Sequence, residues 1–229
     1  MPAPIPALAS PDAPRRRGRP AKAAGDAAGD IRRAALQLFG RQGFEGCSVV
    51  DIARAAGVAK PLVHYHYQTK ELLWQAAVGE ALAQLQHHLA ELTARLSALP
   101  PHEAFRHGAP LLVRHAAQHA ALVRIVVEET GRASERAAWL LREHLIPMYD
   151  AARVGWLQLQ HAGALRPDAP PIEHVIPSVL GLMHFAFLEA EVIQRALGHD
   201  VQSPAYVARQ GELLYQWFAT QCLRAPHQP

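Results

Sequence analysis

Side chains able to bind phosphates and hydrogen-bond base edges are concentrated near the N-terminus. A dense arginine run stands within the first twenty residues, at Arg15, Arg16, Arg17 and Arg19. Guanidinium groups in short basic arms bind narrow A·T-rich minor grooves, where the negative potential of DNA is enhanced. The neighbouring Pro, Ala and Gly residues offer too little apolar surface to fold, so residues 1–25 are predicted to be a disordered basic arm.

A second group of hydrogen-bond donors lies between residues 60 and 70. Its members are Lys60, His64, Tyr65, His66 and Lys70. On a short helix and at the start of the next one, such side chains can contact phosphates and read bases in the major groove. The chemistry expected here is therefore non-covalent recognition of duplex DNA.

Two short predicted helices position these donors. Ser48 is an N-cap candidate with Asp51 three residues later, and Gly57 suits the left-handed turn that ends the first helix. The second helix runs from Lys60 to about residue 65, with Pro61 in its first turn, where the missing N–H costs little. Apolar inner faces would pack the pair as a helix-turn-helix. A purely structural helical hairpin fits the same pattern and is the alternative.

No catalytic or metal-binding constellation is expected. His115 and His119 have the i, i+4 spacing that can place two imidazoles on one metal, but no HExxH motif, cysteine or tight carboxylate cluster accompanies them. The sequence also lacks GxSxG, a phosphate loop and a dinucleotide fingerprint. We predict that the chain is not an enzyme and uses no metal or cofactor; a metal-dependent enzyme or a metal sensor is the alternative for the histidine pair.

Charge is unevenly distributed along the chain. Residues 1–70 hold eleven Lys/Arg against five Asp/Glu, whereas the remainder holds twelve against fifteen. This asymmetry favours a basic module for a polyanion, although a solubilising tail would skew the sum similarly. The distant Cys47 and Cys222 indicate neither a disulfide framework nor a zinc-thiolate site. Because no export signal or membrane span is recognisable, a cytoplasmic location without membrane contact is predicted.

Helical periodicity predicts an all-α fold with about nine helices. The domains expected are the arm (1–25), a three-helix DNA-binding domain with the helix-turn-helix (26–72) and a larger helical domain (73–229). After three short N-terminal helices, a long one starts at Thr69 and ends at Pro100. Pro110 and Pro147 should break or kink their helices, and Pro177 should lie in the first turns of its own. The later helices are expected at 102–119, 121–131, 133–162, 171–198 and 204–223.

Several short patterns occur in residues 28–78 at fixed spacing: Ile31 to Phe39 followed by Gly43-Phe44, Ser48 with Asp51-Ile52-Ala53, Ala56-Gly57-Val58, and Tyr65-His66-Tyr67 leading into Thr69-Lys70-Glu71-Leu72. With this combination the sequence resembles the TetR family of transcription regulators. The resemblance implies a homodimer that binds a double-stranded DNA operator and a small-molecule effector. Repression relieved by the effector is the commonest outcome in this family, and activation is the alternative.

The resemblance also implies roles for single residues. Ser48 would cap its helix and touch a phosphate, and Lys70 would meet another phosphate. The residues expected to face bases are Lys60, Pro61, Leu62 and His64, with Tyr65 and His66 packed on the sugar-phosphate backbone. Five positions depart from the family pattern: Ala59 replaces a frequent capping serine, Pro61-Leu62 a frequent Gly-Thr, His64 an aromatic residue and Tyr67 the closing phenylalanine.

The last two predicted helices carry apolar stripes that would pair with a second copy of the chain. Their members are Val179, Met183 and Phe187 on one helix and Val207, Leu214, Trp217 and Phe218 on the other. A C2 dimer of this kind would place two recognition helices about one DNA turn apart. The alternative is that these stripes form ordinary intramolecular core.

An effector pocket would need aromatic walls with a few polar anchors. The candidates are Arg124, Glu128, Trp139, His144, Trp156, His184 and Phe185. An effector that fits the DNA-incompetent arrangement would move the long helix beginning at Lys70 and so separate the recognition helices. The competing function is a scaffold-type DNA binder without an effector, and a pocket would discriminate the two.

Overall fold

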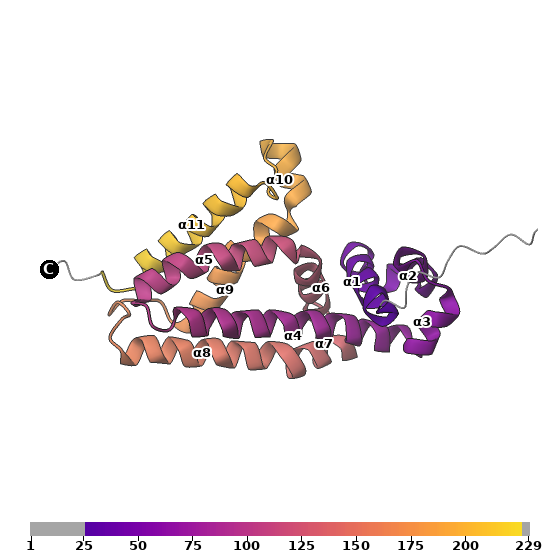
Figure 1. Cartoon of the computed structure of the whole chain (residues 1–229). Coiled ribbons are helices and arrows are strands. Elements are labelled where there is room, and N and C mark those ends of the chain that lie inside the picture. Colours follow the sequence, from indigo (N-terminus) through magenta and orange to yellow (C-terminus); the bar gives the residue numbers. More distant parts are fainter. Residues whose placement is uncertain (1–25, 226–229) are drawn as a thin grey trace, which may run out of the picture.

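The computed structural model describes residues 26–225, and the all-α prediction is confirmed for that range (Figure 1). The basic arm with Arg15, Arg16, Arg17 and Arg19 lies outside the described residues. The helical segments are α1 (Ala27–Gly46), α2 (Val49–Ala56), α3 (Lys60–His66), α4 (Lys70–Leu96), α5 (Pro101–Gln118), α6 (Ala120–Thr130), α7 (Glu135–Leu140), the π-helical η1 (Leu141–Leu145), α8 (Ile146–His161), α9 (Ile172–Leu188), α10 (Ala190–Leu197) and α11 (Pro204–Gln221).

The predicted caps and turns around the helix-turn-helix are present. The Ser48 hydroxyl accepts a hydrogen bond from the Asp51 N–H at 3.1 Å, and Thr69 caps α4 in the same way. Gly57 joins α2 to α3 at φ +70°, and Gly43 bends the last turn of α1 with a φ of +70° as well. A side chain in this left-handed region is strained, which explains why glycine stands at both bends.

Two of the expected long helices are interrupted. The segment predicted at 133–162 consists of α7, η1 and α8, with the π-helical turn just before Pro147, whose ring and missing N–H disturb the preceding turn. The segment predicted at 171–198 divides into α9 and α10, which meet at an angle of 69°. By contrast, α5 runs through Pro110 without ending, and Pro177 lies inside α9.

The helices form a small N-terminal unit and a larger body, joined by α4 (Figure 1). The first core combines residues of α1–α4 with Leu122, Ile125 and Leu140 of the body. It therefore runs across the predicted boundary at residues 72 and 73. Two further cores lie in the body, the larger between α5, α9 and α11. A shared core means that α6 and α7 can transmit movement to the N-terminal unit.

Glycine permits two close helix crossings. A Cβ at Gly40 of α1 would lie 2.7 Å from the Cβ and 2.9 Å from the carbonyl oxygen of Ala121 in α6. A Cβ at Gly211 of α11 would lie 2.7 Å from the Cα of Pro110 in α5. Real Cβ atoms do not approach a backbone this closely, so both crossings depend on the missing side chain.

Candidate functional site

The second helix of the helix-turn-helix presents its polar side chains to solvent. Val63 is 1% exposed and holds α3 against α1 and α2, while Tyr65 is 81% exposed. The side chains of Lys60, His64 and His66 are exposed too, as is Pro61, and Leu62 is half-buried. The predicted reading face is thus available to a partner from the first turn of α3 to its last.

Ser48 and Ala59 define the starts of the two short helices differently. The Ser48 hydroxyl also donates to the Asp51 carboxylate, which in turn accepts from Arg54 at 2.8 Å. These bonds lower the pKa of Asp51, with the Ser48 hydroxyl contributing most. Ala59 provides no side-chain cap for α3, so the start of this helix lacks the hydrogen bond that Ser48 gives α2.

Lys70 contacts the end of α1. Its Nζ donates to the carbonyl oxygens of Phe44 at 2.8 Å and Cys47 at 3.1 Å, where α1 ends, and it lies 4.2 Å from the centre of the Phe44 ring. A lysine at the negative end of a helix satisfies carbonyls that have no helical partner. Lys70 therefore clamps α4 to α1 in this structure, and its contact with a phosphate stays a prediction.

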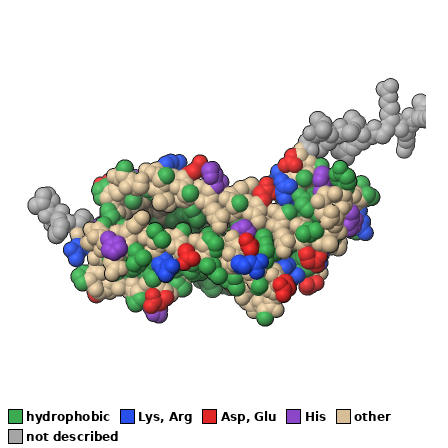
Figure 2. Space-filling view, turned by 90° about the horizontal axis from the view of Figure 1, so that it is seen from below, with side chains coloured by type: hydrophobic (Ala, Val, Ile, Leu, Met, Phe, Trp, Pro, Cys, Tyr) green, Lys and Arg blue, Asp and Glu red, His purple; other side chains and the backbone are tan. Residues whose placement is uncertain are grey.

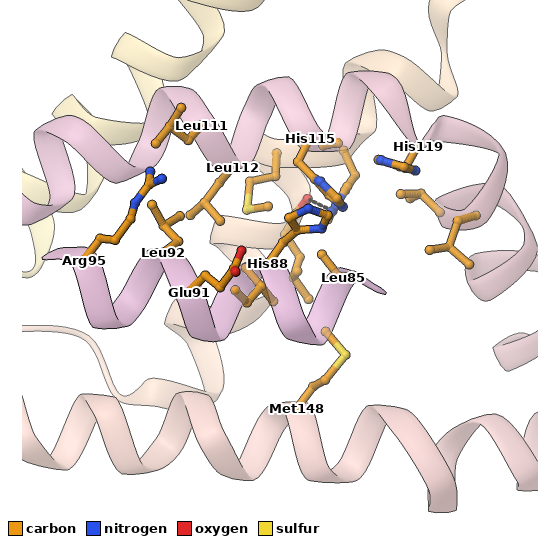
Figure 3. A pocket seen from close by; sticks show the side chains of 17 residues that line it. Leu85, His88, Glu91, Leu92, Arg95, Leu111, Leu112, His115, His119 and Met148 are labelled. Atoms are coloured by element: carbon orange, nitrogen blue, oxygen red, sulfur yellow. Dashed lines mark hydrogen bonds between the residues drawn. The ribbon is translucent and has the colours of Figure 1, made fainter. Parts of the chain in front are cut away.

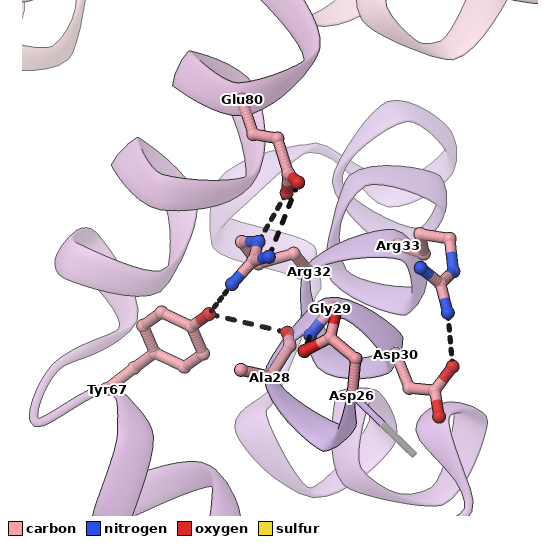
Figure 4. Close-up of polar contacts among 8 residues, drawn as sticks. All are labelled: Asp26, Ala28, Gly29, Asp30, Arg32, Arg33, Tyr67 and Glu80. Atoms are coloured by element: carbon pink, nitrogen blue, oxygen red, sulfur yellow. Dashed lines mark hydrogen bonds and ion pairs between the residues drawn. The ribbon is translucent and has the colours of Figure 1, made fainter.

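Tyr67, a departure from the family pattern, is explained by its hydroxyl (Figure 4). The hydroxyl accepts from Arg32 of α1 at 2.9 Å and donates to the Ala28 carbonyl at 3.4 Å. Arg32 forms an ion pair with Glu80 of α4 at the same time. The network ties the end of α3 to α1 and α4. A phenylalanine here would leave the packing but remove both hydrogen bonds.

Two cationic side chains pack on the Phe44 ring, and one of them connects α1 with the body. Lys70 lies on the Phe44 ring as described, and the guanidinium of Arg136 in α7 lies 3.7 Å from the ring centre. Arg136 also pairs with Glu129 of α6 at 3.2 Å; their side chains are only 17% and 4% exposed. Sequence reasoning missed this cluster, because nothing in the pattern brings residues 44, 129 and 136 together.

A cavity of ≈270 Å³ lies in the body between α4, α5, α6, α8 and α9 (Figure 3). Leucine, valine and methionine side chains form most of its wall. Figure 3 shows His88 of α4 and His115 of α5 pointing toward one another across it. Of the seven residues predicted to bind an effector, only His184 lines this cavity. The cavity is the feature that a ligand-responsive protein needs and a scaffold does not.

The other six predicted effector residues lie outside this cavity, and we remove them from the candidate set. Trp139 and His144 pack together beside Trp74. The others are Arg124, which donates to the Leu188 carbonyl, the exposed Glu128, Trp156, which packs on Phe218, and Phe185, which is 64% exposed. The spacing of residues along one helix could not show which face of that helix packs against α4 and α5.

Four histidines gather at one end of the cavity. The rings of His115 and His119 stack with centres 4.1 Å apart, and those of His88 and His115 lie 5.6 Å apart. Burial, and then the neighbouring imidazoles, lower the pKa of His115 to about 4. Burial also lowers the pKa values of His119 and His184. At neutral pH the rings of His115, His119 and His184 are uncharged hydrogen-bonding groups.

Acidification is expected to destabilise the fold through His115. Its pKa in the folded chain lies below the ordinary 6.5, so the unfolded chain takes up this proton first as the pH falls. The stability linked to the neutral ring is complete above pH 6.5 and is lost between pH 6.5 and about 4. Thermal unfolding at neutral pH and at about pH 5 should therefore show a smaller loss for His115→Gln than for the unaltered protein. Equal losses would contradict this assignment.

The predicted dimer stripes lie largely inside one chain. Phe187, Leu214 and Phe218 are 3%, 0% and 4% exposed. The half-buried members, Val179, Met183, Val207 and Trp217, pack against the same two cores. The alternative, intramolecular core, describes these seven residues better, because each stripe faces α5 or the chain's own C-terminal turn. On the outer faces of the same helices, Phe185 and Leu213 are 64% and 39% exposed.

Three further observations concern the described part of the chain. Within residues 26–225, no group of three or more His, Cys, Asp or Glu side chains is arranged to hold a metal ion. Cys47 and Cys222 are buried and free. In that same range no single helix has the length and hydropathy to cross a membrane, and only the bent pair α9–α10 passes such a test.

Comparison with known proteins connects the N-terminal unit to DNA-binding regulators. The model of the family "Bacterial regulatory proteins, tetR family" matches residues 31–77. A protein of Mycobacterium tuberculosis named for transcriptional regulation of mycofactocin biosynthesis is 38% identical over 66 residues, which make up 29% of this chain and 33% of that protein. The match thus spans about a third of this curated relative.

Solved structures extend the similarity to the whole fold. The ketosteroid transcriptional regulator KstR2 of Mycobacterium tuberculosis matches with a TM-score of 0.68 and 17% identity, over 90% of this chain and 100% of that one. A protein of Mesorhizobium loti assigned to the TetR family matches with a TM-score of 0.63 and 20% identity, over 86% and 97%. Identities this low show a common fold and do not transfer a ligand or a DNA target.

Proposed function

We propose that this chain, whose N-terminal unit matches the tetR family model, is a sequence-specific transcriptional repressor that a small molecule releases from its operator. The observation that carries the proposal is the exposed polar face of α3, held by the buried Val63 inside the matched segment. A helix presented in this way fits the major groove, where base edges differ between sequences.

The cavity supports a role for an effector. Leu122 and Val123 of α6 line it, while Ala121 of the same helix meets Gly40 of α1. Near its other end, α6 carries Glu129, which forms an ion pair with Arg136. Arg136 in turn packs on the Phe44 ring of α1. An occupant that shifts α6 therefore acts directly on the DNA-binding unit. This route adds α6 to the predicted movement of α4, and it favours a regulator over a scaffold.

We place the homodimer contact on the outer faces of α9 and α11. Phe185 and Leu213 are large apolar residues that a lone chain leaves at its surface, whereas the inner faces of both helices are already filled. Pairing the same two helices from each chain gives the isologous contact of a C2 dimer. Phe185→Glu should convert the dimer to a monomer in analytical ultracentrifugation, while Gln158→Glu, at an exposed position of α8, leaves it intact.

Removing the Lys60 charge is expected to weaken DNA binding mainly through electrostatics. Lys60 is exposed at the first position of α3, where a phosphate or base contact releases counterions. In Lys60→Ala the plot of log affinity against log salt concentration should become shallower by about one unit per bound chain. Arg142→Ala, a charge removal on η1, is the matched control and should leave the slope unchanged.

The central experiment measures binding of the purified protein to DNA upstream of its own gene, with a scrambled duplex of equal length as control. The proposal expects preference for the upstream duplex and two chains per site. His64→Ala should reduce this preference more than it reduces binding to the scrambled duplex, because His64 is placed to read bases. Equal affinity for both duplexes, with either protein, would contradict sequence-specific recognition by α3.

A further inference from the structure

The effector cavity continues along the groove between α4 and α5. A second cavity of ≈290 Å³ shares Leu89, Leu92 and Leu112 with the first and extends toward Phe105. Together they follow α4 from Leu85 to Ser97, a distance of about 18 Å at the rise of an α-helix. The combined site is therefore long and narrow, in keeping with an extended ligand rather than a compact one.

Polar side chains are distributed unequally along this site. The second cavity contains no ionisable side chain, and its only side-chain hydroxyls come from Thr93 and Ser97. At the other end stand the four histidines: His88, His115, His119 and His184. Figure 3 shows Leu92, Leu111 and Leu112 on one side of His88 and His115, with Glu91 and Arg95 near them. A matching ligand has an apolar body and one polar end.

The charged groups that line the site do not favour an ionic ligand. α4 supplies Glu91 and Arg95, one of each sign and both exposed, and the Glu91 carboxylate lies 3.3 Å from His87. The lining residues of α6 and α8 are Leu122, Val123 and Met148, none of which ionises. The lining therefore carries no net charge that would compensate the desolvation of a carboxylate or an ammonium group.

His184 shows which hydrogen bond the cavity offers. Its Nδ1 lies 3.0 Å from the Leu180 carbonyl oxygen, which can only accept, so Nδ1 carries the proton. Burial favours the neutral ring by lowering the pKa of His184. In a neutral imidazole with a protonated Nδ1, Nε2 is an acceptor. The histidine end of the cavity thus suits a ligand that donates a hydrogen bond.

We propose that the effector is an elongated, uncharged amphipath: an apolar body that lies along α4 and α5 and a hydroxyl group that hydrogen-bonds the histidine cluster. This inference rests on the proposed function, because a ligand is an effector only if it releases the protein from DNA. Binding of the ligand itself can be measured without DNA. The unbranched alcohol decanol is a suitable probe, with decanoate as its charged counterpart and butanol as its short counterpart.

Calorimetric titration of the full chain at about pH 7.5, well above the lowered pKa values, tests the ligand class. Decanol should bind at least about tenfold more tightly than decanoate, because the carboxylate must lose its hydration, and butanol should bind more weakly than decanol for lack of apolar contact. Tighter binding of decanoate, increasing as the pH falls toward about 5.5, would overturn the proposal in favour of an acidic ligand paired with imidazolium. Equal binding of butanol and decanol would overturn the elongated site.

Variants place the probe in the cavity. His184→Leu should weaken decanol binding by about fivefold, as loss of one hydrogen bond requires, without weakening decanoate equally. Leu92→Trp fills the junction of the two cavities and should abolish binding, whereas Leu157→Trp, at an exposed position of α8, should not. If Leu92→Trp does not fold, Leu89→Phe replaces it. Unchanged decanol binding in the cavity-filling variant would overturn the placement.

The two proposals can fail separately. Decanol that binds in the cavity but leaves the protein on its upstream DNA supports the ligand class and contradicts release by this effector. Upstream DNA that is bound specifically, with no decanol bound by the free protein, overturns the ligand class and leaves the DNA-binding proposal intact.

Discussion

Gly40→Val is expected to destabilise the protein by about 2–3 kcal/mol and to lower its affinity for the upstream DNA. A Cβ at this position meets the Cβ of Ala121 at 2.7 Å and the backbone of Ala121 at 2.9 Å, so α1 and α6 must separate. Because backbone cannot yield as a flexible side chain does, the strain spreads into the core shared by both units. Urea unfolding gives the stability, and duplex binding of the still-folded fraction gives the affinity.

Gly155→Ala is the matched control for this substitution. Gly155 also lies inside a helix, α8, but a Cβ there meets no atom within 4 Å. Alanine at an open helical position should stabilise the fold by about 0.5–1 kcal/mol. Opposite signs for the two glycines would show that the α1–α6 crossing, rather than glycine replacement as such, sets the result. A neutral Gly40→Val would contradict the close crossing.

Local signals in the sequence were sufficient for the N-terminal unit. Ser48, Gly57 and Thr69 act within three or four residues of their own positions, so capping and turn chemistry identify them directly. The same reasoning could not detect the interruption at η1, where Pro147 disturbs a continuous apolar pattern without ending it. The bend between α9 and α10 lacks a glycine or proline at the break and was missed for that reason.

Long-range contacts set the limit for the functional sites. The exposed donors of α3 follow from a short amphipathic helix, but the cavity requires knowing that α4, α5 and α9 face one another. His184 was predicted for its residue type, whereas no local pattern distinguishes His88 as a cavity residue. Apolar stripes likewise could not show whether Phe187 and Leu214 meet a second copy or, as found, their own chain. Periodicity shows which face of a helix is apolar, but it does not show which element or chain packs against that face.

Arg136→Ala is expected to cost about 3 kcal/mol of stability. The substitution leaves the Glu129 carboxylate, 4% exposed, without the guanidinium 3.2 Å away, and removes the cation from one side of Phe44. Leaving a buried carboxylate unpaired costs far more stability than breaking the surface ion pair of Arg142 with Glu143, whose side chains are 67% and 48% exposed. Arg142→Ala should therefore change the free energy of unfolding by less than about 1 kcal/mol.

A double-mutant cycle separates the buried charge from the packing on Phe44. In a Glu129→Gln background no carboxylate is stranded, so Arg136→Ala should cost at least about 1 kcal/mol less than it does alone. Arg136→Lys keeps the charge but loses the planar stack on Phe44, and should lie between the unaltered protein and Arg136→Ala. If the losses in the cycle are simply additive, Glu129 and Arg136 do not act as a pair. The link from α6 to α1 then rests on the Gly40 crossing and the shared core.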